Sequence, residues 1–168
     1  MQARSCGECT ACCQGWLKDD SLEMYPGQPC SHLCDEGCRI YEKRPENPCR
    51  VFKCAWLTNP VDFPDHLRPD KSGFIVMHNR PWQEWLVLHA TPVGLDVNEE
   101  TLDFLKNLSE KCARPLVWHV WDQSGEGKIT EGQQGIFGPQ EFVNRRVAPN
   151  QSRNLSGFSD EDVITFQR

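Results

Sequence analysis

The density of cysteine in one stretch constrains this chain more than any other feature of its sequence. Nine of the ten cysteines of the 168 residues fall between residues 6 and 54. They are Cys6, Cys9, Cys12, Cys13, Cys30, Cys34, Cys38, Cys49 and Cys54, whereas Cys112 stands apart. An ordinary apolar core does not require so much sulfur. The segment is therefore explained either by disulfide bonds or by thiolates bound to metal.

Compartment, length and spacing favour metal over disulfides. The first residues contain no apolar signal segment, so we expect a cytoplasmic protein whose thiols stay reduced. A chain of 168 residues can bury a hydrophobic core without covalent staples. Cys-x-x-Cys spacing aims two sulfurs at one point, whereas the adjacent Cys12 and Cys13 diverge too far to bridge each other. We interpret the segment as a metal-binding module.

The spacing fits zinc or an iron–sulfur cluster. Two pairs of cysteines suffice for tetrahedral zinc. The run Cys6-x2-Cys9-x2-Cys12 repeats the first three ligands of a bacterial ferredoxin-type loop, which favours iron–sulfur and leaves a fourth ligand to come from Cys30, Cys38, Cys49 or Cys54. Cys13 breaks this pattern, because consecutive residues rarely bind one metal ion. It is a ligand of a second metal, a spare thiol or a buried residue.

Two more residues in the segment are candidate ligands, and the basic residues around it suggest a counter-charge. His32 lies among the cysteines and can replace a thiolate, and Cys34 is either a ligand or a small buried side chain. Between Cys38 and Cys54 basic residues outnumber acidic ones, in a chain of net charge −6. They either offset the thiolates or form a solvated surface.

The same stretch resembles a known family of chelating domains. The resemblance rests on Cys6-x2-Cys9-x2-Cys12-Cys13, Cys30-Ser-His-Leu33, Gly37-Cys38-Arg-Ile40-Tyr41-Glu-Lys-Arg44-Pro45 and Cys49-Arg-Val-Phe52-Lys-Cys54. This pattern is similar to the CxxCxxCC zinc- or iron-chelating family, whose domain flagellin lysine N-methylases also contain. It covers roughly the first third of the chain. The resemblance implies chelation by these eight cysteines and leaves Cys34 as an addition, while methyl transfer belongs only to some members.

The remainder of the chain predicts a small sheet and one strong helix. Residues 73–78 and 84–90 are β-branched and aromatic runs separated by a break at 79–81, which predicts an antiparallel hairpin. Residues 116–121 and 127–130 predict two further strands. Asn98 can cap a helix that continues to Cys112 and carries Leu102, Leu105, Leu108 and Cys112 on one face. Short helices are predicted after Gly138 and over residues 159–166.

The fold class expected from these elements is α+β. Residues 1–58 form a loop-rich cysteine metal module, packed on a small, mainly antiparallel sheet with one prominent helix in residues 59–168. The two parts are expected to form one structural unit, because so short a segment with little apolar content depends on metal to fold.

Composition narrows the function. The sequence pI near 5.4 argues against nucleic-acid binding, and no apolar run is long enough to cross a membrane. No phosphate loop, nucleophile elbow or dinucleotide fingerprint is present. His78, His89 and His119 lie on predicted strands, where pairing could join two of them. A trio of them would be a catalytic metal site, although core or surface histidines are the simpler interpretation.

Three functions remain open from the sequence. The first is a small cytoplasmic metal-binding protein whose cluster is structural or redox-active and whose C-terminal region binds another protein. The second is an enzyme that uses the cluster, such as a protein-lysine N-methylase implied by the family resemblance. The third is a carrier or buffer of zinc or iron, which requires exposed and exchangeable thiolates.

Overall fold

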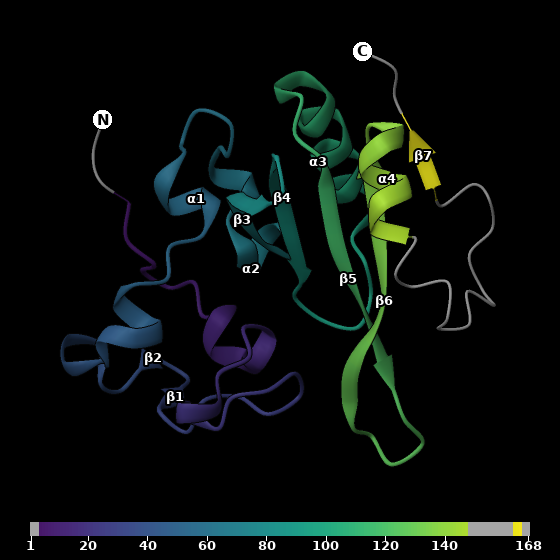
Figure 1. Cartoon of the computed structure of the whole chain (residues 1–168). Helices are drawn as coiled ribbons and strands as arrows, with labels where there is room; N and C mark the ends of the chain where they lie inside the picture. Colours follow the sequence, from purple (N-terminus) through teal and green to yellow (C-terminus); the bar gives the residue numbers. More distant parts are fainter. Residues whose placement is uncertain (1–3, 148–162, 166–168) are drawn as a thin grey trace.

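A five-stranded mixed sheet organises the C-terminal two thirds of the chain (Figure 1). The computed structural model describes residues 4–147 and 163–165. The strand order is β3-β4-β5-β6-β7, with bounds Phe74–Trp82, Trp85–Pro92, Leu116–Gln123, Ile129–Gly138 and Val163–Thr165. The long ladders β3–β4 and β5–β6 are antiparallel, whereas the shorter ladders β4–β5 and β6–β7 are parallel. The predicted α+β class is thereby confirmed.

Helices cover both faces of this sheet. The helices are α1 (Ala55–Thr58), α2 (Pro69–Ser72), α3 (Glu99–Cys112) and α4 (Gln140–Val147). Because side chains alternate along a strand, Leu116 packs on one face with Leu102, Leu105 and Leu108 of α3, and Val117 on the other with Phe142 of α4. No helix within the described ranges combines the length and the apolar character that crossing a membrane requires.

The helix predicted to begin at Asn98 is confirmed by α3. The Asn98 side chain accepts a hydrogen bond from the backbone N–H of Thr101 at 3.0 Å, as an N-cap does. Leu102, Leu105 and Leu108 are buried, and Cys112 packs against the same cluster. Amphipathic spacing and a capping residue therefore located this element correctly.

The predicted hairpin exists, but its turn lies elsewhere. The ladder of β3 and β4 continues past residues 79–81, where its register shifts between Met77 and Arg80, and the turn follows Trp82. Asn79 has a φ of 60°, so the chain forms a bulge at the position predicted as a break. A bulge and a turn share the same residue preferences, and the sequence could not separate them.

The end of the chain corrects a second prediction. Val163–Thr165 form strand β7 instead of part of a helix, and they pair in parallel with residues 136–138 of β6. The proposed cap at residues 159–162 lies outside the described residues. An available sheet edge outweighs the helical preference of so short a segment.

The cysteine segment contains only brief elements. Its helical turns span Cys12–Trp16, Asp20–Leu22, Tyr41–Lys43 and Glu46–Arg50, and its small sheet pairs β1 (Leu33–Cys34) with β2 (Gly37–Cys38). It is joined to the sheet region by packing: Ala11, Cys54 and Trp56 belong to the same buried cluster as Leu88 and Leu105. The guanidinium of Arg4 also donates to the carbonyl oxygens of Trp56 and Phe63, at 2.8 and 2.6 Å.

Candidate metal centre

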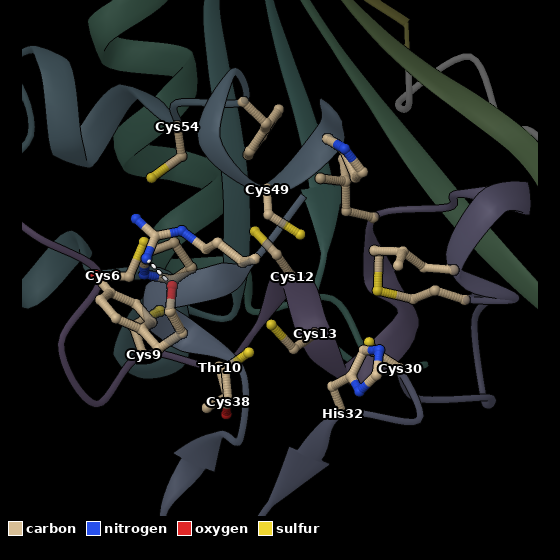
Figure 2. Close-up of a pocket in the computed structure, with 18 of the residues that line it drawn as sticks. Cys6, Cys9, Thr10, Cys12, Cys13, Cys30, His32, Cys38, Cys49 and Cys54 are labelled. Atoms are coloured by element: carbon tan, nitrogen blue, oxygen red, sulfur yellow. Dashed lines mark hydrogen bonds between the residues drawn. The ribbon is translucent and has the colours of Figure 1, made fainter. Parts of the chain in front are cut away.

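A cavity of about 100 Å³ lies within the cysteine segment, and thiols surround it (Figure 2). The chain brings together thiols that lie up to 48 positions apart, from Cys6 to Cys54. All eight cysteines of the predicted ligand set line the cavity: Cys6, Cys9, Cys12, Cys13, Cys30, Cys38, Cys49 and Cys54. His32 lines it too, so it remains a candidate ligand, whereas Cys34 and Cys112 do not belong to the lining.

The first three cysteines are presented by a tight turn. The backbone N–H of Cys9 donates to the carbonyl oxygen of Cys6 at 2.9 Å, and Gly7 between them has a φ of 54° that favours glycine. Burial raises the pKa of Cys9, while hydrogen bonds with the backbone of Ala11 and Asp70 lower it. Backbone donors of this kind are what a knuckle offers to a thiolate.

Gly15 allows the next part of the segment to pack closely on this knuckle. Its φ is 95°, and a Cβ placed there would lie 2.0 Å from the carbonyl oxygen of Tyr25. The turn at residues 25–28 therefore approaches Cys12–Trp16 only because residue 15 has no side chain. The N–H of Cys30 then donates to the carbonyl oxygen of Cys13 at 2.8 Å, which aligns these two thiols along the cavity.

The β1–β2 hairpin separates Cys38 from Cys34. Cys38 pairs with Leu33 in the ladder and lines the cavity, whereas Cys34 pairs with Gly37 and donates its thiol to the carbonyl oxygen of Gly37 at 3.2 Å. The hydrogen bond occupies the Cys34 thiol away from the cavity. The structure thus places the Cys34 thiol within the hairpin and outside the cavity lining.

Arginine side chains hold the loop that carries Cys49. The Arg44 guanidinium lies 3.9 Å from the centre of the Tyr41 ring and donates to the carbonyl oxygen of Tyr41 at 2.7 Å. Arg50 donates to the carbonyl oxygens of Arg44 and Glu42, at 3.0 and 2.8 Å. Arg44 also lines the cavity, and its charge opposes the rise in the pKa of Cys49 that burial and nearby thiols cause. Arg44 is thus a basic residue of the segment whose charge acts on a lining thiol.

Burial and neighbouring thiols favour the protonated form of Cys12 and Cys13. Burial raises the pKa of Cys13 to about 12, with further contributions from Cys38, Cys30 and Cys49. Burial and neighbouring thiols likewise raise the pKa of Cys12 well above its usual value. A metal ion reverses this balance, because it stabilises the thiolates and releases their protons.

The donor atoms of the lining are of the kind that soft metals prefer. Among the described residues that form it, no carboxylate is present, and sulfur is the dominant donor. Thiolates suit zinc, copper(I) and iron–sulfur clusters, whereas magnesium and calcium require oxygen. Within residues 4–147 and 163–165, no three His, Cys, Asp or Glu side chains close tightly enough around one point to hold an ion as they stand. The thiols face a shared space instead.

The histidines on the sheet form a pair. The His89 and His119 rings lie 4.7 Å apart on neighbouring strands, and His119 stacks on Trp121 at 5.6 Å. Burial lowers the pKa of both histidines, to about 4 for His89. His78 is not in ring contact with this pair in the described part of the chain. Strand pairing thus joined two of the three histidines, and a catalytic trio is not formed.

One residue beside the site, Asp70, could not be recognised from any sequence pattern. Asp70, at the start of α2, contacts Cys9 and forms an ion pair with Arg68 at 2.7 Å. It lies beyond the cysteine segment and follows a proline-rich connector, so only the packing of α2 places it there. Its position was therefore unpredictable from spacing.

Comparison with known proteins gave no match. No family model matches the sequence, and neither curated proteins nor solved structures show a significant similarity. The assignment of a function to this chain therefore depends on its own residues and geometry.

Proposed function

We propose that this chain is a metal-binding protein whose cysteine cluster chelates iron, as an iron–sulfur centre, or zinc. The observation that carries the proposal is the convergence of eight thiols on one cavity, from positions between Cys6 and Cys54. Thiols that only fill an apolar core have no reason to face a common space. Metal binding accounts for so many ionisable thiols around one cavity.

Spacing favours iron–sulfur over zinc. Three thiols at x2-x2 spacing repeat a ferredoxin-type loop, and zinc requires only one such pair. An iron–sulfur centre would supply one-electron redox chemistry, and the chain's own residues would set its charge and exposure.

Burial of the thiols favours a resident centre over a carrier. Cys30 and Cys54 are 8% and 5% exposed, and Cys12 and Cys13 are half-buried. Transfer of metal between proteins requires accessible thiolates, because the incoming ligand must reach the metal. The Cys34 thiol, by contrast, hydrogen-bonds within its hairpin and is not in the cavity. We therefore favour a structural or redox-active centre.

Metal analysis of protein isolated without oxygen tests the proposal. An iron–sulfur centre predicts a brown protein with iron and acid-labile sulfide in equal amounts, and a colour that fades on reduction. Colourless protein with bound zinc and no sulfide would identify zinc. Protein without stoichiometric metal under either condition would refute the proposed function.

The β1–β2 hairpin offers a matched pair of variants for this experiment. Cys38→Ser should lower the metal content, because Cys38 lines the cavity. Cys34→Ser should leave it unchanged, although the two residues lie four positions apart in the same hairpin. An equal loss in both variants would show that the metal depends on the hairpin fold and not on the Cys38 thiol.

A further inference from the structure

The adjacent residues Cys12 and Cys13 face different groups of thiols. In Figure 2, Cys6, Cys9 and Cys54 lie to the left of Cys12, whereas Cys13 and Cys30 lie below it. Side chains of consecutive residues diverge, although their Cα atoms are only about 3.8 Å apart. The pair is therefore suited to serve two separate points, one on either side of the chain.

The neighbours of Cys12 form a first set. After burial, Cys54 and the adjacent Cys13 contribute most to the raised pKa of Cys12, followed by Cys9 and Cys6. Cys54 also belongs to the buried cluster of the sheet region, and Cys9 and Cys12 pack against that cluster. The pKa of Cys54 is in turn raised by burial and then by Cys6 and Cys9. Charge interactions weaken with distance, so these sulfurs are mutual neighbours. We call Cys6, Cys9, Cys12 and Cys54 the first set.

The neighbours of Cys13 form a second set. Its pKa is raised by burial and then by Cys38, Cys30 and Cys49, ahead of Cys6. The same relation holds for Cys49, on which Cys30 and Cys38 act most strongly after burial. Backbone structure supports this grouping, because the N–H of Cys30 donates to the carbonyl oxygen of Cys13 at 2.8 Å. We call Cys13, Cys30, Cys38 and Cys49 the second set.

The two sets are also held by different parts of the protein. Cys54 is buried at the start of α1, within the cluster that joins the sheet region, and Cys9 contacts Asp70 of α2. The second set lies on the turn after Cys13, the β1–β2 hairpin and the loop fixed by Arg44. One set is anchored on the sheet region and the other on the cysteine segment itself.

We propose that the eight thiols form two metal centres of four thiols each, one on the first set and one on the second, joined through the peptide bond between Cys12 and Cys13. The inference rests on the proposed function and adds the number and composition of its sites. Four thiolates are the number that tetrahedral zinc or a cysteine-bound iron–sulfur cluster takes. It also gives Cys13, which interrupts the ferredoxin-type run, a defined role.

Two such centres influence each other electrostatically. Four thiolates around a divalent ion, or around an oxidised four-iron cluster, leave about two negative charges on each centre. Arg44 is the one cationic side chain among the described residues of the lining, and it lies by Cys49 of the second set. In an iron–sulfur protein, charge near a cluster alters its reduction potential. The second centre is thus the one that Arg44 renders easier to reduce.

Zinc titration of the full, reduced and metal-free chain tests the partition, with native mass spectrometry as the readout. The unchanged chain should bind two zinc ions, and Cys34→Ser and Cys112→Ser should also bind two. Cys54→Ser and Cys49→Ser should each bind one. Binding of a single zinc ion by the unchanged chain would overturn the inference but leave the proposed function standing, whereas binding of none would refute both.

Double variants test the composition of the two sets, because two substitutions within one set and one substitution in each set should give different zinc contents. Cys6→Ser combined with Cys54→Ser removes two ligands of the first set and should still leave one zinc ion. Cys54→Ser combined with Cys49→Ser removes one ligand from each set and should leave none. The reverse result would show that the sets are wrongly composed. The far-ultraviolet circular dichroism of each variant, dominated by α3 and the sheet, shows whether the rest of the chain is folded.

Discussion

The cysteine segment and the sheet region differ in the interactions that are expected to stabilise them. In the sheet region, strands of eight to ten residues and a helix of fourteen bury Ile75, Leu105 and Leu116 completely. In residues 4–58, no helical turn exceeds five residues, and the space at the centre is lined by sulfur. Apolar burial therefore stabilises one region, and metal ligation is expected to stabilise the other.

The boundary between these regions does not separate two cores. Ala11 and Cys54 lie in the cluster of the sheet region, and Trp16 contacts Trp121 with ring centres 5.9 Å apart. The first set of thiols thus adjoins the apolar interior of the sheet region, whereas no member of the second set belongs to that cluster. Loss of metal should consequently affect the two sets unequally.

Metal removal is expected to have the largest effect. Ligation contributes on the order of 10 kcal/mol in small zinc modules, and residues 13–50 contain only short elements. In reduced, metal-free protein, amide hydrogens of this segment should exchange rapidly, while those of α3 and β5 stay protected. Hydrogen exchange followed by mass spectrometry measures both. Equal thermal stability of metal-free and metal-loaded protein would contradict the assignment of stability to ligation.

A substitution that leaves a cavity in the apolar core should lower the stability of the sheet region without any loss of metal. Leu105 is fully buried on α3, so Leu105→Ala should lower the free energy of unfolding by about 2–5 kcal/mol, while Cys112→Ala on the same helix should cost about 1 kcal/mol. Neither variant should change the metal content. Leu95→Ala serves as the control, because Leu95 is 38% exposed and its loss should cost less than about 0.5 kcal/mol. Loss of metal from Cys112→Ala would show that this thiol is a ligand.

Acid should weaken the sheet region through His89. Burial lowers its pKa to about 4 in the folded protein, with help from His119, Arg80 and Arg146, against about 6.5 when unfolded. Above pH 6.5 both states are neutral there. As the pH falls from about 6.5 to 4, only the unfolded state gains the proton, so the free energy of unfolding falls, by on the order of 2 kcal/mol.

Replacement of the histidine isolates this effect from metal release, which also depends on pH. His89→Gln should flatten the pH dependence between 6.5 and 4 relative to the unchanged chain, as measured by urea denaturation at each pH. A variant with the same pH dependence as the unchanged chain would show that His89 does not titrate as its burial requires.

Local patterns predicted most of the regular elements and the identity of the ligand candidates. Asn98 and the spacing of Leu102, Leu105 and Leu108 located α3, and the apolar runs located β3, β4 and β5. The x2-x2 spacing marked Cys6, Cys9 and Cys12 for a metal. The division at residue 58, the cytoplasmic location and a protein partner for the C-terminal region stay predictions. Caps, periodicity and short spacings are properties of a few neighbouring residues, so the sequence alone suffices for them.

Contacts between distant residues were decided only by the tertiary structure. The sequence could not distinguish Cys34 from Cys38, because only the hairpin pairing turns one thiol to the Gly37 carbonyl and the other to the cavity. It could not show which thiols lie near Cys12 and Cys13, since these come from positions 6 to 54. Nor could it place β7 beside β6, where a sheet edge replaced the expected helix. Each of these depends on which segments meet in space, and that is set by packing over the whole chain.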